Sequence, residues 1–159
     1  MHFADRVVDR TREIGSAVCV GIDPRYELLP RDVVARSADV SGNAAEAAAW
    51  CYVELAARVI DAVSPYACAV KPQMAFFEAL GAPGVRAYEK TLALARDAGV
   101  PSIADAKRAD IGSTSAAYAS AFFGGNLLGD AACAGMGADS LTINPYFGTD
   151  GVDPFLSRA

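Results

Sequence analysis

Short apolar runs alternate along this chain with longer segments in which apolar residues recur every three or four positions. The short runs cover 17–22, 66–70, 100–104 and 140–143, and the last two also contain Ser or Thr. Continuous apolar runs of this length are typical of strands that are buried on both faces of a sheet. The pattern therefore predicts parallel strands joined by helices.

The intervening segments have helical periodicity. We predict helices over 3–14, 44–63, 84–98 and 112–123, a further short helix over 127–135, and a loop or broken helix over 30–42. The expected buried face of 44–63 carries Ala48, Tyr52, Leu55, Val59 and Ala62. A turn is expected over 81–84, Gly99 is expected just after a helix, and the tail after Pro154 could begin another helix.

Two architectures fit this alternation, an open doubly wound sheet and an eight-stranded (β/α)8 barrel. A complete barrel typically needs about 250 residues, whereas this chain has 159. No Gly-rich phosphate loop follows the first predicted strand, which disfavours a nucleotide-binding doubly wound sheet. The residues alone thus leave either an open sheet or about half of a barrel.

Composition indicates one globular domain spanning 1–159. Hydrophobic residues make up 53% of the chain, which is too many for a disordered protein. The net charge of −5 argues against nucleic acid or an anionic membrane as a partner. The only histidine, His2, lies at the terminus, so we expect no histidine-based metal site.

The cysteines and the amino terminus predict a cytoplasmic protein. Cys19, Cys51, Cys68 and Cys133 have no CxxC spacing and lie among apolar neighbours, as reduced and packed thiols do. Residues 1–15 are charged throughout and lack the apolar segment of a signal peptide. No apolar run approaches the ~18 residues needed to span a bilayer.

Polar side chains follow each of the four predicted strands. In chain order they are Asp23, Lys71, Asp105 with Lys107, and Asn144. Parallel α/β folds bind their ligands at the carboxyl ends of the strands. We therefore expect these side chains to share one edge of the sheet and to form a site there.

Asp105 and Lys107 are the sharpest of these signals. On an extended backbone, residues two apart point to the same side, so a carboxylate and an ammonium would meet. Each would favour the charged form of the other, and the ammonium would become a positioned proton donor. Asp110 could complete an Asp-Lys-Asp array. The alternative is a solvated ion pair on a loop, which contributes ~0–1 kcal/mol.

Lys71 admits more than one interpretation. It could simply extend into solvent at the end of its strand. A desolvated lysine in a barrel could also be a Schiff-base nucleophile, as in class I aldolases. Composition does not choose between these.

Several runs together resemble the orotidine 5′-phosphate decarboxylase family, in its bacterial branch. They are GIDP at 21–24, KPQ at 71–73 leading into FFE at 76–78, DAKRADIG at 105–112 and NPYFG at 144–148. The resemblance runs from about Val18 to Phe155. The DxKxxD spacing is shared with related sugar-phosphate decarboxylases, whereas Lys71 favours the orotidylate enzyme.

This resemblance implies a homodimeric (β/α)8 barrel, of which about the first four β/α units are present. It implies decarboxylation of orotidine 5′-phosphate to UMP without a metal or an organic cofactor. Lys107 would be the proton donor to C6 of the pyrimidine, and Asp105 would lie beside the substrate carboxylate. Lys71 and Asp23 would hold the ribose hydroxyls and the charge array.

The resemblance also implies that Asp110 and Thr114 reach into the active site of the other subunit. In the family, later strands supply the contact to the pyrimidine amide, the phosphate-gripping loop and a phosphate-binding arginine. Those strands would follow Ala159, so we expect decarboxylation to need them. The alternatives are a Schiff-base aldolase that uses Lys71 or Lys107, and a non-catalytic half-barrel that associates with itself or with a partner half.

Overall fold

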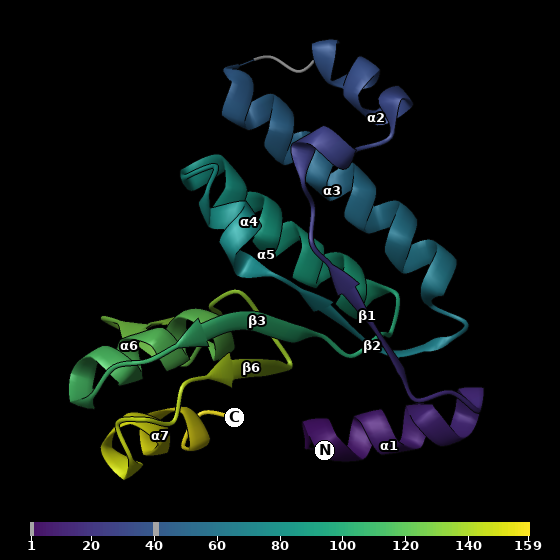
Figure 1. The fold of residues 1–159 in the computed structure, drawn as a ribbon. Coiled ribbons are helices and arrows are strands. Elements are labelled where there is room, and N and C mark those ends of the chain that lie inside the picture. Colours follow the sequence, from purple (N-terminus) through teal and green to yellow (C-terminus); the bar gives the residue numbers. More distant parts are fainter. Residues whose placement is uncertain (1, 40–41) are drawn as a thin grey trace.

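The computed structural model describes residues 2–39 and 42–159, in which strands and helices alternate (Figure 1). The principal strands are β1 (Val18–Ile22), β2 (Ala67–Pro72), β3 (Ile103–Arg108) and β6 (Ser140–Ile143). The helices are α1 (Phe3–Ile14), α2 (Arg31–Arg36), α3 (Ala44–Val63), α4 (Met74–Glu78), α5 (Ala82–Asp97), α6 (Gly112–Phe123) and α7 (Thr149–Leu156). Two 3-10 turns, η1 (Tyr26–Leu28) and η2 (Ser37–Asp39), flank α2.

The principal strands are parallel and lie side by side in chain order. β1 pairs with β2, and β3 pairs with β6. The bridges Val70↔Ser102 and Gln73↔Asp105 join β2 to β3. Each strand is thus the neighbour of the next one along the chain, as in consecutive β/α units of a barrel, and all carboxyl ends share one edge.

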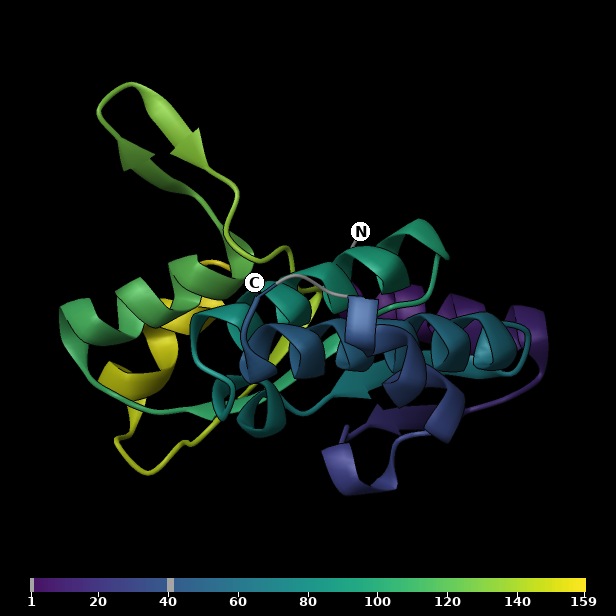
Figure 2. The ribbon, with the colours of Figure 1, turned by 90° about the horizontal axis from the view of Figure 1, so that it is seen from above.

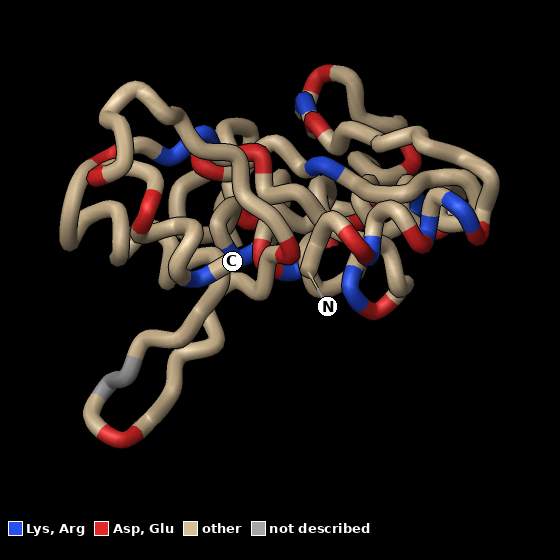
Figure 3. Tube along the Cα trace, turned by 90° about the horizontal axis from the view of Figure 1, so that it is seen from below, with Lys and Arg blue, Asp and Glu red and all other residues tan. Residues whose placement is uncertain are grey.

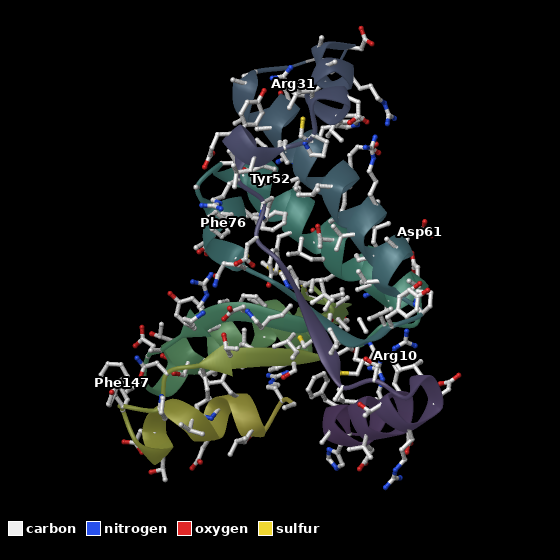
Figure 4. All side chains as sticks on the ribbon, turned by 45° about the vertical axis from the view of Figure 1, so that its right-hand side comes forward. Arg10, Arg31, Tyr52, Asp61, Phe76 and Phe147 are labelled. Carbon is white, nitrogen blue, oxygen red and sulfur yellow. The ribbon has the colours of Figure 1, made fainter. Side chains whose placement is uncertain are left out.

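The core lies between the strands and the α3–α5 helix pair. Asn43 and Glu46 form a capping box that starts α3 at the predicted residue. Phe77, which is fully buried, packs edge-on against Tyr52 and Tyr88, with ring centroids 5.6 and 5.1 Å apart. Figure 4 shows Tyr52 inside this layer. The aromatic cluster fixes how α3, α4 and α5 sit on the sheet.

The opposite face of β1 is open. Val20 and Ile22 pack towards the helices, whereas Cys19 and Gly21 on the other side of the strand are exposed. This alternation is the period of two that a strand imposes. The expectation of packed cysteines is therefore wrong for Cys19, and also for the exposed Cys133; Cys51 and Cys68 are buried.

Helix α1 closes the amino-terminal end of the sheet. The Arg10 guanidinium donates to the carbonyl oxygens of Ser64, Ala67 and Gly99, the last two at 2.9 and 3.2 Å. Arg6 forms an ion pair with Asp139, whose carboxylate also accepts from the Ser102 amide at 2.9 Å. The contacts at this end serve stability, because ligands bind at the opposite end of such sheets.

The segment between α6 and β6 is a hairpin, so the helix predicted over 127–135 is wrong. β4 (Asn126–Leu128) and β5 (Ala131–Cys133) pair antiparallel through the two residues Gly129 and Asp130. Gly129 has a φ of +65°, which suits the first central position of a two-residue hairpin turn. The hairpin projects from the body (Figure 2), and Figure 3 shows an acidic residue at its tip.

Other boundaries also differ from those expected. The predicted turn over 81–84 is wrong, because Gly81 caps α5 and Pro83 occupies its first turn, where proline is tolerated. β3 starts at Ile103 and continues to Arg108, so it includes the charged residues that were expected to follow it. α7 begins before Pro154 and carries that proline within it.

The buried face of α3 is also rotated from the expected one. It consists of Ala48, Ala49, Cys51, Tyr52, Ala56 and Ile60. Leu55 and Val59 are only half-buried, and Ala62 is exposed. The small residues lie inwards because α5 packs closely there.

None of the described helices has the length and apolar character needed to cross a membrane.

We expect Phe77→Ala to lower the free energy of unfolding by about 3–5 kcal/mol, because it leaves a cavity between three helices. Urea unfolding followed by circular dichroism measures this change. Phe147→Ala is the matched control, since Phe147 is 56% exposed and projects from the molecule in Figure 4. Equal losses in the two variants would contradict this account of the core.

Candidate active site

The carboxylate of Asp105 is the centre of the shared sheet edge. Its Oδ2 accepts from Lys71 Nζ at 2.8 Å and from Gln73 Nε2 at 2.9 Å. Its Oδ1 accepts from Lys107 Nζ at 2.5 Å and from the Thr142 hydroxyl at 2.9 Å. The Asp105 side chain is only 6% exposed. Every lone pair of the carboxylate is thus used, by two cations and two neutral donors.

These contacts determine the protonation of the site. Burial opposes the charged form of Asp105, but hydrogen bonds from Lys107, Lys71 and Thr142 outweigh it and lower the pKa of Asp105 to about 2. The hydrogen bond to Asp105 is the main reason why the pKa of Lys71 is raised above its ordinary value. At neutral pH the site therefore holds a carboxylate and a protonated Lys71.

Strand geometry separates Asp105 from its charged neighbour Arg108. The Arg108 guanidinium points to the helix side, where it pairs with Glu78. It also lies 5.3 and 5.6 Å from the ring centroids of Tyr118 and Phe122. The ammonium of Lys107 instead stays on the open side with Asp105, and its side chain is 65% exposed.

The structure brings together Lys71, Asp105 and Lys107 among the residues expected at the site. Asp23 is exposed and lies near enough to Lys71 to contribute to its raised pKa. Asn144 does not join the cluster: its side chain accepts from the Tyr146 amide at 3.0 Å and shapes a turn. It therefore serves the loop after β6.

Asp110 and Thr114 lie apart from this cluster. The Asp110 carboxylate accepts from the Ile111 amide at 2.9 Å, and Thr114 is exposed in the first turn of α6. Within the described part of the chain, no hydrogen bond joins either residue to Asp105 or Lys107. The array formed inside one chain is therefore Lys71–Asp105–Lys107, without Asp110.

Sequence reasoning missed the roles of Gln73 and Thr142. Gln73 had no predicted role beyond its place in the KPQ run, yet it donates to Asp105 and also accepts from the Ala75 amide at 3.3 Å, capping α4. Thr142 places a hydroxyl between Leu141 and Ile143 in the half-buried strand β6. That hydroxyl, flanked by two apolar residues near the carboxyl end of the strand, was the available signal.

The arrangement suits an anionic substrate. Two ammonium groups are accessible, while the carboxylate beneath them keeps its charge and fixes their position. An ammonium held in this way can bind a negative group or deliver a proton to carbon. No group of three or more His, Cys, Asp or Glu side chains that could hold a metal ion occurs among the described residues.

The lowered pKa of Asp105 predicts a pH dependence of stability. Because the pKa in the folded state is below the unfolded value of 3.8, the stabilisation is present above pH 4 and is lost as the pH falls towards 2. We expect the free energy of unfolding of the wild type to fall more steeply over this interval than that of Asp105→Asn. Urea titrations at a series of pH values measure both slopes, and parallel slopes would contradict the assignment.

The chain is similar to known proteins over nearly its whole length. A family model described as "Orotidine 5'-phosphate decarboxylase / HUMPS family" matches residues 16–159. The orotidine 5′-phosphate decarboxylase of Deinococcus radiodurans is 41% identical over 157 residues, which are 99% of this chain and 48% of that protein. That of Natronomonas pharaonis is 40% identical over 159 residues, covering all of this chain and 50% of the relative.

Solved structures give the same result. The structure of Leishmania donovani OMP decarboxylase matches with a TM-score of 0.72 and 34% identity, covering 99% of this chain and 50% of that one. The chain thus spans about half the length of the relatives it matches. The expected α/β fold of the (β/α)8 barrel type is confirmed, with roughly half of the barrel present. The chain belongs to the orotidine 5′-phosphate decarboxylase / HUMPS family.

Proposed function

We propose that this chain carries the decarboxylation centre of an enzyme that converts orotidine 5′-phosphate to UMP in pyrimidine synthesis. The observation that carries the proposal is the buried, ionised Asp105, which holds Lys107 Nζ at 2.5 Å on the accessible edge of the sheet. Membership of the family and the identity of its relatives support the substrate. The reaction class is that of a carbon–carbon lyase.

Lys107 is the proposed proton donor. When the bond between C6 and the carboxylate of the pyrimidine breaks, carbon dioxide leaves and the electron pair remains on C6. The ammonium of Lys107 transfers a proton to C6, and the amine then regains a proton from solvent. Asp105 holds the ammonium in place before the reaction, so little reorganisation is needed when charge develops. This chemistry invokes no metal or organic cofactor.

Lys71 and Asp23 are proposed to bind the ribose hydroxyls. Lys71 Nζ is anchored on Asp105 at 2.8 Å, and its side chain is 36% exposed, so it can still contact a ligand. The raised pKa of Lys71 keeps it protonated. A Schiff-base nucleophile must be a neutral amine, so this pairing disfavours the aldolase alternative for Lys71.

The active site is proposed to be shared between the two subunits of a homodimer. Asp110 and Thr114 lie just beyond the carboxyl end of β3 and contact the cluster of their own chain through no hydrogen bond that the described residues show. We propose that both side chains reach the site of the neighbouring subunit, where Asp110 would complete the charge array.

The cytoplasmic location that the sequence indicates stays a prediction.

We expect Lys107→Ala to lower orotidine 5′-phosphate turnover at least about 100-fold, because the proton donor is lost. The loss of substrate is followed by ultraviolet absorbance. Two forms are compared: the 159-residue chain and a fusion of it to the second half of the Deinococcus radiodurans relative. If the fusion turns over the substrate and the 159-residue chain does not, the later strands are needed.

Lys90→Ala is the control, because Lys90 is exposed on α5 and lies outside the site. Undiminished turnover in Lys107→Ala would refute the role of the proton donor. Borohydride trapping of a keto-sugar phosphate on Lys71 or Lys107 would favour the aldolase, and inactivity of both forms would favour the non-catalytic half-barrel.

Subunit mixing tests the shared site. Lys107→Ala and Asp110→Asn homodimers are each expected to be inactive, whereas their mixture regains about one quarter of wild-type turnover. Random exchange makes half of the dimers mixed, and each mixed dimer has one intact site out of two. If Asp110 acted within its own chain, mixing would restore nothing.

A further inference from the structure

The hydroxyl group of Thr142 uses all of its hydrogen-bonding capacity at the site. Its oxygen accepts from the amides of Ala106 at 3.1 Å and of Lys107 at 3.0 Å. A hydroxyl oxygen has two lone pairs, so both are occupied. Its single hydrogen is then directed to Asp105 Oδ1, which lies 2.9 Å away. The hydroxyl is thus a donor of fixed orientation.

These bonds occur where the ladder between β3 and β6 is interrupted. Ala104 pairs with Leu141 and Arg108 pairs with Ile143, so residues 105–107 stand opposite Thr142 alone. The extra residues form a bulge, and bulges re-aim side chains beside active sites. The hydroxyl takes the place of a main-chain carbonyl and satisfies two amide groups that the bulge removes from the ladder.

The bulge also explains the backbone of Lys107. Its φ of +48° is the only positive φ of a non-glycine residue in the described part of the chain. A residue with a side chain rarely adopts this conformation unless its surroundings impose it. On a regular strand, the alternation of side chains between the two faces would alone decide where the Lys107 ammonium points. Here the Thr142 hydroxyl also accepts from the Lys107 amide and so holds the backbone that carries the Lys107 side chain.

We propose that Thr142 is a positioning residue of the decarboxylation site, whose hydroxyl holds the Asp105 carboxylate and the Lys107 ammonium in the geometry for proton transfer. This inference rests on the proposed function and deepens it. Thr142 links the two groups because one oxygen contacts the carboxylate of Asp105 and the amide of Lys107. Its effect on the reaction is therefore exerted through both.

The test compares Thr142→Val, which keeps the shape and removes the hydroxyl, with Thr142→Ser, which keeps the hydroxyl. We expect Thr142→Val to lower kcat about 10- to 100-fold with a smaller change in KM, since it misplaces the proton donor. Thr142→Ser should restore kcat to within about threefold of the wild type. Turnover is measured in whichever form is active, the chain or the fusion described above.

A second measurement needs no turnover. NMR follows the pKa of the Asp105 carboxyl group in the substrate-free chain. This pKa should be higher in Thr142→Val than in the wild type, because the hydroxyl is one of the groups that lower it. In Thr142→Ser it should match the wild-type value. This arm supports or refutes the positioning role even if no form decarboxylates the substrate, which would refute only the proposed function.

Two results would overturn the inference. If Thr142 only joins β3 to β6, Thr142→Val will lower the melting temperature but leave kcat and the pKa of Asp105 unchanged. If Thr142→Ser behaves like Thr142→Val, the methyl group rather than the hydroxyl is what the site needs. The thermal melt of each variant, followed by circular dichroism, accompanies both measurements.

Discussion

The burial of one negative charge is the constraint on which the rest of this site depends. A carboxylate taken out of water is strongly destabilising unless it is paired and hydrogen-bonded. Asp105 meets this requirement with two donors on each oxygen. The donors are Lys71 on β2, Gln73 directly after β2, Lys107 on β3 and Thr142 on β6. Because those donors come from three strands, the charge is compatible only with the strand order and register that the protein has.

The two ends of the sheet serve different purposes. At the amino-terminal end, Arg10 and Asp139 tie α1 and the loops to the strands through ion pairs and main-chain oxygens or amides. At the carboxyl end, polar side chains satisfy one another around Asp105 and leave two ammonium groups accessible. The bulge in β3 also serves the carboxyl end, because it interrupts the regular pairing with β6 where Lys107 is placed.

The open face of the sheet follows from the extent of the fold that is present. Residues such as Cys19 and Gly21 point to the side that the interior of a barrel would fill, and they are exposed here. The chain spans about half the length of its relatives. The proposed substrate and subunit partner therefore concern a catalytic unit that also contains the other half of the barrel. The proposed decarboxylation centre lies on β2, β3 and β6, which this chain contains.

Local pattern determined much of this protein. Periodicity predicted α1, α3 and α6 at their observed bounds, and the spacing of Asp105 and Lys107 indicated a charged pair. Local pattern misread the β4–β5 hairpin, because two apolar residues before a Gly-Asp turn suit either element. Tertiary structure alone decided the donor set of Asp105, since Lys71, Gln73 and Thr142 lie 34, 32 and 37 residues away along the chain. Such contacts depend on strand register, which no local pattern encodes.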